Sequence, residues 1–265
     1  MENDFKLITH NFNNDIVIYP ISDVHLGSLE HNSVEWYKFI DKVKSEPNSY
    51  IILAGDLMNN ATKSSVSNVF DETLRPREQK ERLVCFLSPI KNKIICAVSG
   101  NHERRSGKDA DNDPMYDIMC KLDLEHLYRQ NIAFIKIQLG KRNTEPNKGE
   151  AAYTFAVTHG TGGGIFTGAS VNRNERFGYV IDNLDCLIVG HTHKGVVSKP
   201  SKIVIDARND KVTMKPFTVV STQSWLSYGG YAMQKMLLPS STSSCDNGQK
   251  ILLSKNQKKN LCVIW

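Results

Sequence analysis

The chain has 265 residues, of which 40% are apolar and 23% are charged. This length is long for a single hydrophobic core but lies within the range of layered α/β domains. The composition is that of a soluble globular protein, and no apolar stretch approaches the ~20 residues that a membrane-spanning helix needs. The net charge of +5 permits an acidic or phosphorylated partner without requiring one.

The first half of the chain alternates between strand and helix patterns. Strands are expected near residues 16–22, 50–54 and 93–98, and helices near 33–45 and 77–90. A further helix is expected from about 114 to 121, because Asp113 can cap its first turn and a proline follows directly.

From about residue 132 the pattern changes to strands, expected at 132–138, 151–158, 186–189, 196–199, 202–206, 211–214 and 217–222. Alternating apolar residues around Asn209-Asp210 predict a hairpin. A helix-rich half followed by a strand-rich half suits two facing sheets covered by helices. With no repeat or linker, we expect one domain over 1–265, with a core at about 16–222 and an extension at 223–265.

Five short polar motifs each follow an apolar or β-branched run. They are Asp23-Val24-His25, Gly55-Asp56, Gly100-Asn101-His102-Glu103, Thr158-His159-Gly160 and Gly190-His191-Thr192-His193. A strand that ends in a polar residue delivers that residue to one edge of its sheet. Five such strands can therefore converge on one rim.

The residue types in these motifs suit metal ions. Carboxylate, amide and imidazole ligands without thiolate favour manganese, iron or zinc, and two such ions can clamp both oxygens of a phosphate ester. Asp56 is the natural bridge, with Asp23, His25 and one histidine of the last motif on the first ion. Asn101, His159 and the other histidine would complete the second. Alternatively, Asp56 and Asn101 are ordinary turn residues and the histidines lie in the core.

The order D-x-H, G-D, G-N-H-E, H-G, G-H-T-H over residues 23–193 resembles the calcineurin-like metallophosphoesterase superfamily. The resemblance implies a four-layer αββα sandwich with two mixed sheets. It also implies two divalent ions, with manganese the first expectation and iron, zinc or nickel the alternatives. One ion would be held by Asp23, His25, Asp56 and His193, and the other by Asp56, Asn101, His159 and His191.

The same resemblance implies that His102 lies outside the metal shell, near the scissile phosphate. There it would steady the transition-state charge or protonate the leaving oxygen, because its pKa is near neutrality. The alternative is that His102 only hydrogen-bonds a metal ligand.

The motif details favour a phosphodiesterase that acts on nucleic acid or nucleotides. The second motif reads GDLMNNA, without the arginine of the protein Ser/Thr phosphatases, which carry G-D-x-V-D-R-G. The opening SDVHLG resembles the branch with DNA-repair exonucleases, UDP-diacylglucosamine hydrolase and cyclic-nucleotide phosphodiesterases. Alternatives are a phosphomonoesterase, a nucleotide-sugar pyrophosphatase and a catalytically silent scaffold, which the intact ligand set argues against.

Four residues beside the motifs are candidates for substrate contact. Arg104 and Arg105 follow the GNHE motif, and a guanidinium suits phosphate oxygens. The alternative for both is a surface pair with Glu103 or a nearby aspartate. Asn59 and Asn60 are close enough to Asp56 in the chain to reach a substrate.

The N-terminal sequence and the cysteines indicate a cytoplasmic protein without a membrane partner. MENDFKLITHNFNND is polar and acidic, where a signal peptide would be basic and then apolar. Six cysteines without a C-x-x-C spacing are expected to be reduced thiols in the core.

Overall fold

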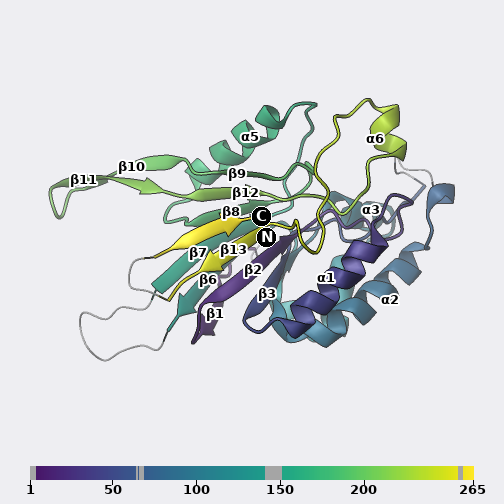
Figure 1. Cartoon of the computed structure of the whole chain (residues 1–265), viewed down its shortest axis with the longest axis horizontal. Helices are drawn as coiled ribbons and strands as arrows, with labels where there is room; N and C mark the ends of the chain where they lie inside the picture. Colours follow the sequence, from purple (N-terminus) through teal and green to yellow (C-terminus); the bar gives the residue numbers. More distant parts are fainter. Residues whose placement is uncertain (1–3, 64, 66–68, 141–150, 256–258) are drawn as a thin grey trace.

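The computed structural model describes residues 4–63, 65, 69–140, 151–255 and 259–265. Two six-stranded mixed sheets stack face to face, and helices cover their outer faces, so the fold is the expected four-layer αββα sandwich (Figure 1). The larger apolar core extends between the sheets and under the helices that cover one of them, and a smaller core lies on the outer face of the other sheet, around Leu187 and Phe217.

The first sheet has the strand order β14-β13-β2-β3-β4-β5. Its parallel strands are β2 (Ile16–Ile21), β3 (Ser49–Leu53), β4 (Ile94–Val98) and β5 (Tyr128–Arg129). The antiparallel strands β13 (Lys250–Leu253) and β14 (Leu261–Ile264) extend it beside β2. Because β3 and β4 are covered on both faces, they read as continuous apolar runs.

The second sheet has the order β1-β6-β7-β8-β12-β9. Its strands are β1 (Ile8–Phe12), β6 (Ile132–Leu139), β7 (Ala151–Thr158), β8 (Cys186–Val189), β9 (Val196–Ser198) and β12 (Thr218–Ser221). Strands β7 and β8 are parallel neighbours, so their carboxyl ends lie at the same edge of the sheet.

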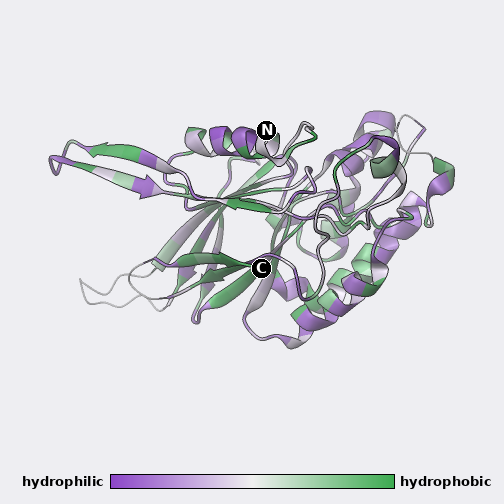
Figure 2. Ribbon diagram, turned by 45° about the horizontal axis from the view of Figure 1, so that its top comes forward, coloured by the Kyte–Doolittle hydropathy of each residue, from purple (hydrophilic) through white to green (hydrophobic). Residues whose placement is uncertain are grey.

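The predicted hairpin is confirmed. Strands β10 (Ser201–Asp206) and β11 (Lys211–Pro216) pair antiparallel as a separate two-stranded sheet. This hairpin projects from one end of the molecule, and Figure 2 shows apolar residues along it.

Two helices illustrate how the sequence determines the outer layers. Helix α1 (Ser33–Ser45) begins at Asn32, whose side chain accepts from the N–H of Glu35 at 3.3 Å, and buries Trp36, Phe39, Ile40 and Val43 at helical spacing. Helix α4 (Pro114–Lys121) begins at Asp113, which accepts from the N–H of Tyr116 at 3.1 Å as predicted.

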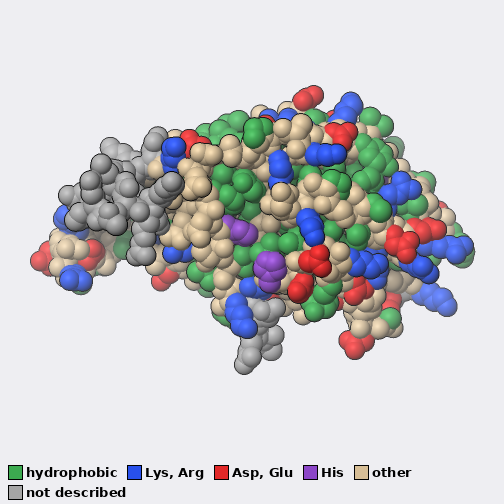
Figure 3. All heavy atoms as spheres, turned by 90° about the horizontal axis from the view of Figure 1, so that it is seen from below, with side chains coloured by type: hydrophobic (Ala, Val, Ile, Leu, Met, Phe, Trp, Pro, Cys, Tyr) green, Lys and Arg blue, Asp and Glu red, His purple; other side chains and the backbone are tan. Residues whose placement is uncertain are grey.

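Helix α2 (Pro76–Leu87) is shorter than the predicted 77–90. A 3₁₀ segment (Ser88–Lys93) replaces its last turn, because Pro89 disfavours a continued α-helix. Acidic and basic side chains lie side by side at the end of the molecule opposite the hairpin (Figure 3). On α2, Arg77 Nε lies 3.0 Å from Glu81 Oε1.

Several elements were not predicted from the sequence. They are β1, β5, β13, β14, α3 (Asn101–Ala110), α5 (Thr167–Val180), the short α6 (Gly230–Gln234) and the 3₁₀ turns Val69–Asp71 and Glu125–Leu127. Two strands of the expected extension, β13 and β14, complete the first sheet.

All six cysteines are free, but the prediction of core thiols is wrong for some of them. Cys96 and Cys186 are buried, whereas Cys85 and Cys262 are exposed, because they lie on the outer surface of a helix and an edge strand. Among the described helices, none has both the length and the apolar character needed to cross a bilayer.

Candidate active site

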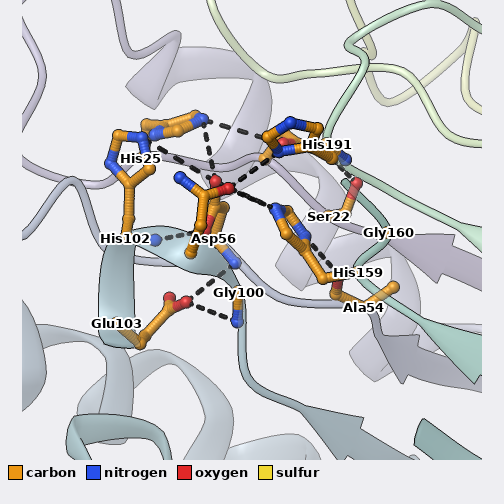
Figure 4. Close-up of polar contacts among 12 residues, drawn as sticks. Ser22, His25, Ala54, Asp56, Gly100, His102, Glu103, His159, Gly160 and His191 are labelled. Atoms are coloured by element: carbon orange, nitrogen blue, oxygen red, sulfur yellow. Dashed lines mark hydrogen bonds and ion pairs between the residues drawn. The ribbon is translucent and has the colours of Figure 1, made fainter. Parts of the chain in front are cut away.

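The five polar motifs meet at one place. Asp23, Asp56 and Asn101 follow the carboxyl ends of the adjacent parallel strands β2, β3 and β4. His159 and His191 follow the adjacent parallel strands β7 and β8 of the facing sheet. Figure 4 shows the side chains from both sheets pointing toward one another.

The backbone at this place is strained. Five residues of the motifs have a left-handed φ: Asp23 (53°), His25 (48°), Asp56 (53°), His191 (72°) and His193 (57°). Non-glycine residues rarely adopt this conformation, and it persists only where the surrounding structure holds it. Such strain is typical of functional sites.

Asp56 lies at the centre of the cluster and is buried. Its Oδ2 is 3.1 Å from His159 Nε2, 3.8 Å from His102 Nε2 and 3.9 Å from His25 Nε2. Its Oδ1 accepts a hydrogen bond from the N–H of His102 at 2.8 Å. Burial alone would raise the pKa of Asp56, but the surrounding imidazoles, His159 foremost, hold it below its ordinary value.

Asp23 organises a neighbouring group. Its Oδ1 lies 3.1 Å from His193 Nε2 and 3.8 Å from His25 Nε2, and this buried oxygen has no hydrogen-bond partner among the described residues. Its Oδ2 accepts from the N–H of His191 at 2.9 Å and from the Ser22 hydroxyl. The Nε2 atoms of His25 and His193 face each other at 3.2 Å.

Asn101 completes a third set of converging atoms. Its Oδ1 lies 3.0 Å from His159 Nε2 and 2.7 Å from His191 Nδ1. His159 uses Nδ1 to donate to the carbonyl of Ala54 at 2.8 Å, which leaves Nε2 of a neutral ring as an acceptor. That nitrogen therefore points at two acceptor oxygens, those of Asn101 and Asp56.

Acceptor atoms that face one another in a buried place need a cation between them. A proton can serve, because Asp56 outweighs the effect of burial and raises the pKa of His159 to about 9. A divalent ion suits the same atoms, since carboxylate, amide and imidazole are ligands of such ions. Three groups have ligand atoms within 4.8 Å of one another: Asp23, His25 and His193; Asp56, His159 and His191; and His25, Asp56 and His102.

Sequence reasoning missed the role of Glu103. Its buried carboxylate accepts from the N–H groups of Asp56 (2.9 Å), Met58 (3.0 Å) and Gly100 (2.9 Å). Burial and the nearby Asp56 charge raise the pKa of Glu103 to about 7, although these hydrogen bonds oppose the rise. Its place in the first turn of α3, three residues after Gly100, is the signal that could have identified it as part of a capping box.

Ser22 and Thr222 were also missed. The Ser22 hydroxyl contacts both Asp23 and the Thr222 hydroxyl, and thereby ties the end of β2 to the segment after β12. No local pattern marks this pair, because the two residues are far apart in the sequence.

The four predicted substrate residues lie in different surroundings. Arg105 Nη2 is 2.9 Å from His102 Nε2, and Arg105 Nη1 donates to the carbonyl of Asn59 at 3.2 Å. Arg104 instead donates to the carbonyls of Ser99 and Gln130, at 2.9 and 3.2 Å. Neither guanidinium has a described hydrogen bond to Glu103.

The side chains of Asn59 and Asn60 form hydrogen bonds with neighbouring groups of the protein. Asn60 is buried, and its amide donates to the carbonyl of His102 at 2.7 Å and to the hydroxyl of Ser106 at 3.0 Å. The Asn59 side-chain amide donates to Glu72 at 3.1 Å, and the backbone carbonyl oxygen of Asn59 contacts His102 Nδ1 at 2.7 Å. Of the four residues, Arg105 is the one whose side chain contacts the imidazole of His102.

Two stacked sheets that bring carboxylates, imidazoles and an amide to one buried point define a metal-binding α/β enzyme. The family model described as calcineurin-like phosphoesterase matches residues 16–195, and the chain belongs to that family. It is therefore a hydrolase that acts on phosphate esters, with the metal dependence of its family.

Two solved structures resemble the chain. One is a conserved uncharacterized protein from Streptococcus pneumoniae, described as a predicted phosphoesterase, with 12% identity and a TM-score of 0.37. The other is a metallophosphoesterase from Sphaerobacter thermophilus, with 12% identity and a TM-score of 0.38. Each alignment covers 94% of this chain and 89% of the other. No curated protein matches the sequence.

Proposed function

We propose that the chain is a phosphodiesterase that hydrolyses nucleic acid or nucleotides with two divalent metal ions. The observation that carries the proposal is the position of Asp56, whose Oδ2 faces His159 on one side and His25 on the other. One carboxylate between two ligand groups suits a pair of cations, because its charge offsets their repulsion.

Each ion then has its own ligand set. Asp23, His25, Asp56 and His193 hold one, and Asp56, Asn101, His159 and His191 hold the other. Manganese is the first expectation, with iron, zinc or nickel as alternatives, because the ligands are oxygen and nitrogen without sulfur. When bound, the ions supply a water of lowered pKa and positive charge for the phosphate oxygens.

His102 and Arg105 act on the phosphate. Burial and His25 lower the pKa of His102 to about 3, below the near-neutral value expected from the sequence, so the free ring is neutral with Nε2 turned toward Asp56 and Arg105. A bound phosphate anion favours protonation of Nε2. The protonated ring and the guanidinium then present adjacent donors that can stabilise the transition-state charge, and the ring can protonate the leaving oxygen.

The choice of a diester rests on the second motif. Asn60 stands where the protein Ser/Thr phosphatase pattern carries its arginine, and it is buried against the backbone of His102. The site thus lacks a cation there for the second negative charge of a monoester. The SDVHLG opening supports the same branch of the superfamily. Phosphomonoesterase and nucleotide-sugar pyrophosphatase activities are the alternatives.

A substrate panel with added manganese tests the proposal. It contains single- and double-stranded DNA, RNA, cyclic nucleotides, nucleotide sugars, and p-nitrophenyl phosphate beside its bis ester. We expect cleavage of the bis ester and of a nucleic acid or nucleotide, and loss of both activities in Asp56→Asn. Preferential turnover of the monoester or of nucleotide sugars would favour an alternative. A protein that neither binds metal nor cleaves any ester would be a scaffold.

The role of His102 has a separate test. His102→Ala should slow turnover by roughly a hundredfold to ten-thousandfold, the range for a lost general acid. The loss should shrink for substrates with good leaving groups, and metal content should stay that of the unmodified protein. A His102→Ala protein that loses metal would instead make this residue a ligand.

A further inference from the structure

The hairpin of β10 and β11 carries an apolar surface that has no part in the function proposed above. In its register, Ile203 lies opposite Met214 and Ile205 lies opposite Val212. Residues directly opposite each other on antiparallel strands, and residues two apart on one strand, project from the same face of a sheet. The four side chains therefore form one continuous surface, which we call the hairpin patch.

The hairpin patch is exposed, and its face of the hairpin carries no charged side chain. Ile203 is 74% exposed, Ile205 is 75%, Val212 is 69% and Met214 is 71%. The two other strand residues on this face, Ser201 and Pro216, lie opposite each other. The charged residues of the hairpin lie on its other face or in its turn; they are Lys202, Asp206, Arg208, Asp210, Lys211 and Lys215. A contiguous apolar centre with charges around it is typical of a protein–protein interface.

Contacts on the other face fix the direction in which the patch points. Lys202 and Lys215 lie opposite each other on that face. Lys202 Nζ donates to the carbonyl of Ile181, directly after α5, and lies 5.7 Å from the centre of the Phe217 ring. Lys215 Nζ donates to Asn183 Oδ1 at 2.9 Å. This face is therefore turned toward the segment that follows α5, and the hairpin patch is turned away from that segment.

The hairpin also projects away from the active site. Strand β8 ends at the turn that carries His191, and β12 runs parallel to β8. Strand β9 runs antiparallel to β12, so it leads the chain away from that turn and toward the start of β10. Figure 1 shows the hairpin on the opposite side of the molecule from α3, the helix that begins at Asn101. A partner bound to the hairpin patch would therefore leave the active site open.

The area of the patch suits contact with a second, identical patch. Four aliphatic side chains at this exposure present roughly 400 Å² of apolar surface, so contact between two copies would bury roughly 800 Å². Together with Ser201 and Pro216 the contact reaches about 1,000 Å², the lower limit for a specific interface and the range of weak, reversible ones. A face without charged side chains offers little to a nucleic acid or an acidic segment, whereas a second copy offers an equally apolar surface of the same size.

A two-fold axis through the patch would make the contact self-complementary, because the same residues then meet on both copies. Two sheet faces can stack ~10 Å apart with their side chains interdigitated. Such a layer also stabilises the hairpin itself, since two strands alone are at best marginally stable in water and need an apolar face packed against another element.

We infer that the hairpin patch binds the same patch on a second copy of the chain, and that the protein therefore forms a weak symmetric dimer with both active sites open. The dimer does not depend on the proposed phosphodiesterase function, because the contact uses no residue of the active site. Burial of four apolar side chains from each copy stabilises it, and the small area keeps the association reversible.

Sedimentation velocity over a series of micromolar protein concentrations tests for the dimer. Val212→Glu places a carboxylate on the hairpin patch. Thr213→Glu is the matched control, because Thr213 is the next residue of β11, is exposed, and lies on the opposite face of the hairpin. The two variants carry the same change of charge on the same strand, so a difference between them reports on the face. Val212→Thr is a milder variant that keeps the β-branched shape of the side chain.

We expect the unmodified protein and Thr213→Glu to show the same equilibrium between monomer and dimer, with a micromolar Kd. Val212→Glu should raise the Kd at least about tenfold, because a carboxylate from each copy would lose water without gaining a partner. Val212→Thr should raise it by a smaller factor, and decides the matter if circular dichroism shows that Val212→Glu is misfolded. Turnover of the bis ester per chain should be the same in monomer and dimer.

Three results would overturn the inference. A monomer at every concentration would leave the hairpin patch to a partner of different sequence. An equal Kd for Val212→Glu and Thr213→Glu would place the dimer contact elsewhere on the molecule. A mass that keeps growing with concentration would show open-ended association instead of a closed dimer. Because the measured quantity is mass, each result holds whether or not any phosphate ester is cleaved.

Discussion

Glu103 shows how one side chain sets the geometry of the site. Its two carboxylate oxygens receive three backbone N–H groups, from the turns that follow β3 and β4. These turns carry Asp56 and Asn101, the central carboxylate and the amide of the cluster. A buried acceptor shared by two turns fixes their separation, so Glu103 determines where the two side chains meet without contacting a substrate.

Glu103→Gln tests this role. The amide oxygen can accept, but the NH₂ group would face an N–H, and at least one buried donor would lose its partner. We expect a loss of about 1–3 kcal/mol in the free energy of unfolding, measured by urea denaturation, together with weaker metal binding. Glu81→Gln, on the exposed face of α2, is the control and should change stability by less than ~0.5 kcal/mol. Equal stability of the two variants would contradict the role assigned to Glu103.

At the scale of elements, the site depends on the close approach of the turns after β3 and β4. A Cβ on Gly100 would lie 2.0 Å from Asp56 Oδ1 and 2.2 Å from the backbone nitrogen of Asp56. Backbone atoms cannot give way to that extent. Gly100→Ala should therefore displace Asp56, and we expect loss of most activity and metal binding, measured by metal analysis and turnover of the bis ester.

Gly107→Ala is the control within the same helix. The nearest atom to a Cβ at Gly107 is the Asn112 carbonyl oxygen at 3.6 Å, which is an ordinary contact. Replacing a helical glycine should leave activity unchanged and raise stability by up to about 1 kcal/mol. If Gly100→Ala were as active as Gly107→Ala, the two turns would be less tightly packed than the structure indicates.

The elements also show which parts of the fold the sequence could predict. β2, β3, β4 and β8 were predictable, because buried parallel strands are apolar runs that end at a polar residue. β7 was predictable because it buries alternate residues along most of its length. Helix α5 was not, since its buried positions are Ser170, Asn174 and Gly178, which give no apolar periodicity. Helix α3 is polar throughout, with Glu103 as its buried residue.

At the scale of the whole molecule, the cluster joins the two halves of the chain. Asp23 accepts from the N–H of His191, and His159 contacts Asp56 and Asn101 across the interface of the sheets. Local patterns predicted that such residues lie at strand ends. They could not predict which histidine approaches which carboxylate, because that depends on how the sheets stack. The assignment of His191 and His193 came from the family resemblance.

Because the cluster joins the sheets, its charge should affect the stability of the entire fold. Asp56 raises the pKa of His159 to about 9, above the ordinary value of 6.5, although burial opposes this. A raised folded-state pKa stabilises the fold below about pH 6.5, and this contribution is lost as the pH rises toward 9. We therefore expect the metal-free protein to unfold at a lower temperature at pH 8.5 than at pH 6.5.

Bound metal should reverse this dependence of the unfolding temperature on pH. Binding to His159 Nε2 requires the neutral ring, so metal displaces the proton more easily as the pH rises. Metal at a hundred times its Kd stabilises a fold by about 2.7 kcal/mol, and the increase in Tm on adding manganese should be larger at pH 8.5 than at pH 6.5. In Asp56→Asn the attraction that raises the pKa of His159 is gone. Both the fall in Tm of the metal-free protein and the pH dependence of the metal effect should then shrink, whereas an unchanged profile in that variant would show that His159 does not govern it.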